Sequence, residues 1–71
     1  MPLIQVKIID EVFTPAQKKA MIEKLTDAMV AIEGEKLRPS TWVLIEDVHS
    51  GDWGIGGKPV TAEAIRAVAK A

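Results

Sequence analysis

Apolar and polar residues alternate at the start of the chain, and this pattern predicts a β-strand over residues 3–9. Ile4, Val6 and Ile8 recur at every second position, with polar residues between them. A period of two places such residues on one face of a strand. We therefore expect one apolar and one more polar face in this first element.

A helical pattern follows. Thr14 is suited to cap a helix, Pro15 to its first position, and Gln17, three residues after the cap, to close a capping box. Apolar residues then recur at spacings that place them on one helix face: Met21, Leu25, Ala28, Met29 and Ile32. Gly34 favours a helix end, because glycine accepts the left-handed backbone. The sequence predicts an amphipathic helix between Thr14 and Gly34.

A second strand is predicted over residues 41–48, where the chain is nearly continuously apolar up to Glu46. Such a run is typical of a strand covered on both sides. We expect residues 35–40 to form a polar loop, since Pro39 disfavours helix at Arg38. A strand, a helix and a strand joined in this order form a βαβ unit with parallel strands.

The last third of the chain is rich in glycine. Residues 49–59 carry Trp53 and Ile55 among four glycines and predict a loop or a hairpin that lies over another part of the molecule. Thr61 is a candidate cap for a short helix over residues 62–70.

Length and composition favour one small domain that needs a partner. The 71 residues form a single domain, 1–71, with 48% hydrophobic residues and no cysteine. A core of this size is only marginally stable, and small domains usually need a disulfide, a metal site or oligomerisation in addition. Disulfides are excluded here because there is no cysteine. A histidine-based metal cluster is improbable because His49 is the single histidine. Two strands and one helix do not close a core. We expect a homo-oligomer in which a second copy supplies further strands.

Charge and hydropathy exclude several function classes. The net charge is −1, and no basic stripe is present that would neutralise nucleic-acid phosphates. No apolar run approaches the roughly 20 residues of a membrane span, and the N-terminus lacks a signal-peptide pattern. We expect a cytoplasmic protein that acts on a small molecule.

Pro2 is the residue with the clearest chemical potential. A small second residue favours removal of Met1, which leaves the secondary amine of Pro2 as the N-terminus. The pKa of an ordinary α-amino group is about 7.7–8.0, and burial against apolar walls lowers it. The amine is therefore suited to act as a general base near neutral pH. Alternatively, Pro2 is only a tolerated residue at the start of a strand. If Met1 is retained, the Pro2 nitrogen is an amide and cannot act as a base.

Four features of the chain occur together: Pro2 at the head of a strand, Gln17-Lys18 at the helix start, Ser40 before the second strand, and the motif Trp53-Gly54-Ile55-Gly56-Gly57. Over residues 2 to about 58 they resemble the 4-oxalocrotonate tautomerase family. The resemblance implies an α+β fold with a β-α-β protomer. Two such protomers form a four-stranded sheet with two helices, and three dimers usually form a hexamer.

The resemblance also implies an activity. Pro2 would be general base and acid, moving a proton between carbon and oxygen of a small enol or 2-oxo acid, with no cofactor and no metal. Trp53 stands where the family keeps an aromatic pocket wall, Ile55 would line the same pocket, and Ile9 matches an apolar pocket position.

Two arginines that bind substrate carboxylates in this family are absent. Their positions fall at Val12 or Phe13 and at Trp42. Trp42 would make the pocket wall apolar and favour a less charged or aromatic substrate. Arg38, four residues before Trp42, and Lys7 on the first strand are the candidate substrate-binding cations. Arg38 is at least equally suited to be a solvent-exposed loop residue.

Three functions follow from these residues. The first is a cofactor-independent tautomerase with Pro2 as base. The second is a hydratase or dehalogenase of small unsaturated acids on the same scaffold, which needs a protonated Pro2 and a carboxylate to activate water. The third is a non-catalytic oligomeric module that has lost the two arginines.

Overall fold

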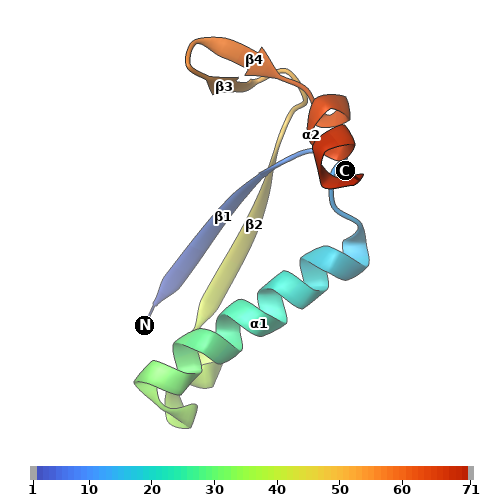
Figure 1. The fold of residues 1–71 in the computed structure, drawn as a ribbon. Coiled ribbons are helices and arrows are strands. Elements are labelled where there is room, and N and C mark those ends of the chain that lie inside the picture. The colour runs from blue at the N-terminus through green and yellow to red at the C-terminus, as the bar shows by residue number, and fades with distance from the viewer. Residues whose placement is uncertain (1, 71) are drawn as a thin grey trace.

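The computed structural model describes residues 2–70 (Figure 1). In chain order the elements are β1 (Leu3–Ile9), α1 (Pro15–Glu33), the 3₁₀ helix η1 (Glu35–Ser40), β2 (Trp42–Val48), β3 (Trp53–Ile55), β4 (Lys58–Val60) and α2 (Ala62–Lys70).

The first two strands pair in parallel. β1 runs beside β2 in a register that begins with Leu3 opposite Trp42 and ends with Ile9 opposite Val48. A parallel pair needs a long crossover, and α1 supplies it along one side of the two strands (Figure 1). The predicted βαβ unit is confirmed.

The start and end of α1 follow from local chemistry. Thr14 Oγ1 accepts a hydrogen bond from the Gln17 backbone N–H at 3.1 Å, and Gln17 Oε1 accepts one from the Thr14 N–H at 2.8 Å. Gly34 ends the helix with φ 104°, and its N–H donates to the Val30 carbonyl oxygen. Both predicted boundaries are confirmed, because the residues that cap the helix act within one turn.

Only one face of the β1–β2 sheet is covered. An ion pair of 2.7 Å joins Lys18 on α1 to Asp47 on β2 and places Asp47 on the helix side. On the opposite face Leu3, Trp42 and Leu44 are 51%, 52% and 42% exposed. The expectation that β2 is covered on both sides is therefore wrong for a single protomer, because α1, the longest helix among residues 2–70, packs on one side.

The buried stripe of α1 differs from the predicted one. Met21, Leu25 and Met29 are half-buried as expected, but Val30 is the buried residue of the helix. Ile32 is 85% exposed. Two residues turn a helix by about 200°, so Ile32 points away from the side on which Val30 lies.

Residues 35–40 form the 3₁₀ helix η1 rather than an irregular loop. Backbone hydrogen bonds of this tighter type join Leu37 to Gly34 and Thr41 to Arg38. Pro39 has no backbone N–H, so it cannot take part in the hydrogen bonds of an α-helix as a donor. Neither of the two 3₁₀ bonds needs a donor from Pro39, and a short 3₁₀ turn therefore still forms.

The glycine-rich segment forms a hairpin beyond the ends of β1 and β2 (Figure 1). β3 and β4 pair antiparallel, with Trp53 opposite Val60. Gly56 and Gly57 form the turn with φ 59° and 83°, and two positive values suit a tight hairpin turn that glycine adopts without strain. Of the two alternatives, loop or hairpin, the hairpin is confirmed.

The predicted C-terminal helix is also confirmed. Thr61 Oγ1 accepts a hydrogen bond from the Ala64 N–H at 3.2 Å, and Ser50 Oγ accepts one from the Ala62 N–H at 2.9 Å. Ala62 is 1% exposed. The first turn of α2 is therefore anchored against the segment that follows β2.

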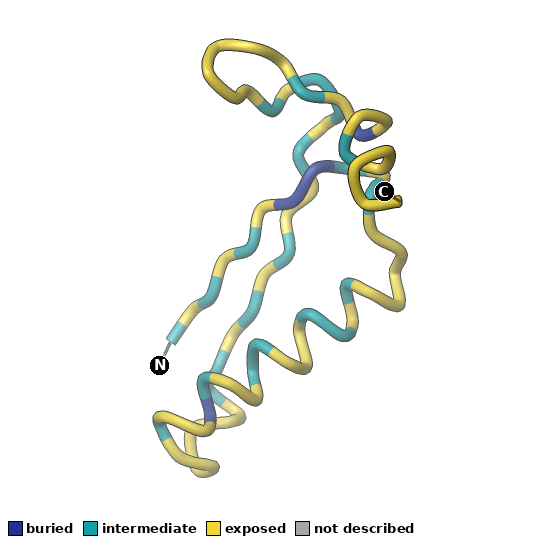
Figure 2. Tube along the Cα trace, in the orientation of Figure 1, coloured by how far each residue is buried: buried dark blue, intermediate teal, exposed yellow. Residues whose placement is uncertain are grey.

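Few side chains are fully buried. Within residues 2–70, the buried apolar residues are Ile8, Ile9, Val30 and Ala62 (Figure 2). A chain of this size buries only about 60% of its unfolded surface. The open sheet face and the small core together indicate that one protomer does not bury its apolar surface alone.

We predict that Thr14→Ala lowers the free energy of unfolding by about 1 kcal/mol, because the Gln17 N–H loses its acceptor. Urea unfolding followed by circular dichroism at one fixed protein concentration measures this. Thr14→Ser keeps the hydroxyl and should stay close to the original protein. Equal stability of Thr14→Ala and the original protein would show that the cap contributes nothing.

Candidate functional site

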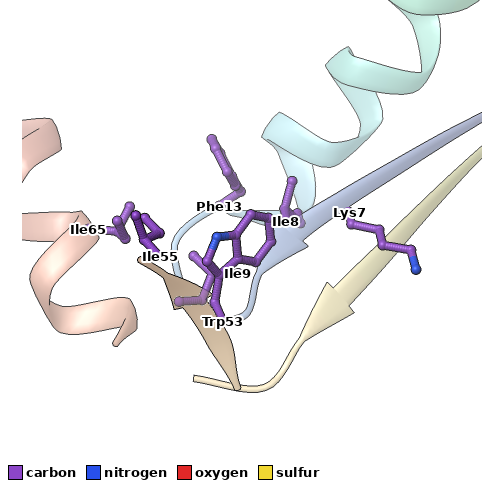
Figure 3. A pocket seen from close by; sticks show the side chains of 7 residues that line it. All are labelled: Lys7, Ile8, Ile9, Phe13, Trp53, Ile55 and Ile65. Carbon is purple, nitrogen blue, oxygen red and sulfur yellow. The ribbon is translucent and has the colours of Figure 1, made fainter. Parts of the chain in front are cut away.

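An apolar hollow of about 340 Å³ lies at the end of β1 (Figure 3). It is lined by side chains from β1, the loop after it, β3 and α2: Lys7, Ile8, Ile9, Phe13, Trp53, Ile55 and Ile65. Its volume falls in the range of small-molecule pockets, roughly 300–1,000 Å³. Six of the lining side chains are apolar, so the hollow suits the hydrocarbon part of a small ligand.

The hairpin brings three predicted pocket residues together. Trp53 and Ile55 are two residues apart on β3, so both side chains lie on the same side of that strand. Ile9, 6% exposed at the end of β1, lines the same hollow (Figure 3). The structure thus places these three side chains around one hollow.

Four further residues line the hollow: Lys7, Ile8, Phe13 and Ile65. Lys7 is one of the two candidate cations, and Phe13 stands at a position where the family resemblance would place an arginine. Ile65 was not considered, although it lies three residues after the buried Ala62. That spacing places both on one face of α2, but the burial of Ala62, which shows this face to be the inner one, follows from the fold and not from the sequence.

Pro2 lies at the other end of β1. Its carbonyl oxygen accepts a hydrogen bond from the Trp42 N–H at 3.0 Å, so the β1–β2 ladder extends to Pro2. Pro2 is half-buried, and the Trp42 side chain is 52% exposed. Seven strand residues of about 3.3 Å each place Pro2 more than about 20 Å from Ile9. The predicted site residues therefore form two groups at opposite ends of one strand.

Arg38 belongs to the Pro2 end and is bound to carboxylates of its own protomer. Its guanidinium donates to Glu35 at 2.6 Å and to Asp27 at 2.9 Å. The hydrogen bond to Glu35, and then that to Asp27, raise the pKa of Arg38 above its ordinary value. Arg38 is thus a permanent cation whose hydrogen-bonding edges are directed at α1 and η1, and the structure does not place it at the hollow.

Metal binding and membrane crossing can also be assessed from the described residues. Among the residues that the structure describes, no three histidine, aspartate or glutamate side chains gather closely enough to hold a metal ion. Neither α1 nor α2 combines the length and the apolar character that a membrane-crossing helix requires.

Comparison with known proteins adds an independent line of evidence. A family model described as "Tautomerase enzyme" matches residues 2–63. The chain is 45% identical over 62 residues to a probable tautomerase of Ralstonia nicotianae, covering 87% of this chain and 86% of that protein. It is 42% identical over 57 residues to the 2-hydroxymuconate tautomerase of Pseudomonas putida, covering 80% and 87% of the two chains.

The fold has solved counterparts. A structure from a study of the 4-oxalocrotonate tautomerase isozymes of Methylibium petroleiphilum superimposes with a TM-score of 0.71 at 40% identity. The superposition covers 90% of this chain and 97% of that one. Nearly the whole of that protein is therefore represented here.

We predict that Trp53→Ala weakens binding of phenylacetamide, a neutral apolar probe, by at least about tenfold, because the hollow loses a large part of its wall. Titration of the ¹⁵N-labelled protein followed by NMR gives the Kd. Ile32→Ala is the matched control, since Ile32 is 85% exposed and does not line the hollow. Equal weakening in both variants would mean that the probe does not bind in this hollow.

Proposed function

The chain belongs to the tautomerase family, and we propose that its Pro2 is the general base and acid that moves one proton between carbon and oxygen of a small enol or 2-oxo acid. The protein is an isomerase-type enzyme with a tautomerase-type function. Such a reaction removes a proton and returns it elsewhere on the same molecule. One group of suitable pKa is sufficient, and no redox partner is required.

The observation that carries this proposal is how Pro2 is held. Its carbonyl oxygen accepts a hydrogen bond from the Trp42 N–H at 3.0 Å, directly before β1, and its ring fixes φ, so the nitrogen has little freedom to move. Removal of Met1 exposes this nitrogen as a secondary amine. Met1 lies outside the described residues, and the mass of the intact protein decides whether it is removed.

An apolar pocket would keep such an amine neutral, but the hollow lies at the far end of β1 in the same protomer. β1 pairs only with β2 among the described strands, so its other edge is open. Two β1 strands that pair antiparallel about a two-fold axis set the start of each against the end of the other. Pro2 of one protomer then meets Ile9, Trp53 and Ile55 of the second.

The same pairing gives a four-stranded sheet with both helices on one face. Its other face carries Leu3, Trp42 and Leu44, which are exposed in one protomer. An exposed apolar patch of this kind marks an interaction surface. We therefore propose that dimers pack through these faces into a hexamer, as a trimer of dimers, with one domain in each protomer.

The lining of the hollow favours proton transfer over hydration. Hydration or dehalogenation of an unsaturated acid needs a carboxylate that activates water. None of the seven lining side chains is an aspartate or a glutamate. The apolar walls, together with Trp42 beside Pro2, favour a substrate with an apolar or aromatic group.

We predict that Pro2→Ala lowers kcat/KM for the ketonisation of an aromatic enol 2-oxo acid by about 10²–10⁴-fold, the usual contribution of a positioned base. The loss of the enol absorbance band follows the reaction, and mass spectrometry first confirms that Met1 is absent from both proteins. Ile32→Ala provides a control outside the site. Unchanged turnover by Pro2→Ala would exclude Pro2 as the base.

Shared sites make a second prediction possible. Pro2→Ala and Trp53→Ala chains, unfolded together and refolded as a mixture, form mixed dimers in which one of the two sites has both original residues. If pairing is random, about a quarter of all sites are intact, and activity should rise to about that fraction of the original. A mixture no more active than the mean of the two separate variants would show that both residues act within one protomer.

A further inference from the structure

Arg66 on α2 lies just outside the hollow, whose lining residues do not include it. Its Nη1 donates a hydrogen bond to the Glu11 carbonyl oxygen at 2.7 Å. Ile65, the preceding residue, lines the hollow. Glu11 itself lies between two lining residues, Ile9 and Phe13. The guanidinium therefore joins the two segments that bound one side of this hollow.

Most of the hydrogen-bonding capacity of Arg66 is unused. A guanidinium has five N–H donors in a planar fork. Among residues 2–70, the Glu11 carbonyl is the one acceptor that Arg66 reaches, and no carboxylate pairs with it. Arg38, by contrast, is bound to two carboxylates. Arg66 thus keeps a free edge for a carboxylate in the two-point geometry that arginine favours.

The position of Arg66 is set by folded parts of the chain. The buried Ala62 and the hydrogen bond from its N–H to Ser50 Oγ fix the start of α2 one turn before Arg66. On the other side, Glu11 has φ 66°, a left-handed value that is uncommon for a residue other than glycine. The bond from Arg66 holds the carbonyl of this unusual backbone position, so helix and loop orient each other.

We propose that Arg66 is the carboxylate-binding residue of this pocket, and that the pocket takes an apolar or aromatic acid with one carboxylate. The apolar walls accept the hydrocarbon part, and the free guanidinium edge just outside them accepts the charged group. Lys7 is the one charged lining side chain, and its ammonium points away from the Trp53 ring (Figure 3). Arg66 also lies beyond residues 2–63, the part of the chain that the family model matches.

This inference rests on the proposed function for the identity of the reaction, but binding can be measured without turnover. Phenylacetate and phenylacetamide share their shape and differ in charge. Arg66→Gln keeps an amide donor and removes the charge. We expect it to raise the Kd of phenylacetate by about tenfold or more, as for the loss of a hydrogen bond to a charged group. The Kd of phenylacetamide should change by less than about twofold.

Two further variants separate charge from structure. Arg66→Lys keeps the charge without the fork and should bind phenylacetate with intermediate affinity. Lys70→Gln is the matched control: it removes a positive charge from the same helix, one turn further on, and should change neither Kd. NMR titration provides the four sets of constants, and circular dichroism verifies that each variant is folded.

The proposal is overturned if Arg66→Gln leaves phenylacetate binding unchanged. It is equally overturned if both probes weaken by the same factor, since Arg66 would then only hold the loop. In turnover, Arg66→Gln should raise KM more than it lowers kcat, whereas Pro2→Ala should lower kcat and retain charge-dependent binding of phenylacetate. Failure of the base assignment and failure of the Arg66 assignment are thus seen in different constants.

Discussion

The parallel pairing of β1 with β2 is the constraint on which the rest of the molecule depends. It holds Pro2 against Trp42 at one end and places Ile9 beside the hairpin at the other. A strand is stiff and extended, so this pairing separates the proposed base from the apolar walls by the whole length of β1. The separation is a direct reason to expect a site shared between copies: the open edge of β1 can bring the two ends together only through a second strand running in the opposite direction.

The same constraint explains why so little of the chain is buried. In a two-stranded sheet with one long helix, the helix covers one face and the other face is exposed to solvent. The side chains exposed on that second face are large and apolar. Exposure of this kind is costly in water, which favours association of protomers through this face. Under the proposed pairing of two β1 strands, changes at β1 would alter stability and activity together, so variants far from the strand edges are the appropriate controls.

Sequence predicts the parts of this structure that are determined locally. The capping residues Thr14 and Gly34 act within a few residues, and the helix boundaries they predict are observed. The buried stripe of α1 was harder to predict, because the orientation of a helix depends on the sheet it packs on, and Val30 rather than Ile32 faces inward. Ile65 was missed for a similar reason: its place at the hollow results from the docking of α2, a contact between segments distant in the sequence.

The two arginines Arg38 and Arg66 also differ in a way that is set by the fold and not by local sequence. Both carry the same guanidinium group, and Arg38 stands nearer in sequence to a position where the family resemblance implies an arginine. In the folded protein Arg66 is the better candidate for binding an acid. Arg38 forms ion pairs with carboxylates on α1 and η1, whereas Arg66 donates only to a backbone carbonyl among the described residues. A cation already paired with two carboxylates offers little to a ligand, whereas one held by a neutral acceptor retains its charge and most of its donors. The capacity to bind an acid therefore depends on what surrounds each guanidinium, and Arg66 on α2, next to the lining residue Ile65, has no carboxylate partner within residues 2–70.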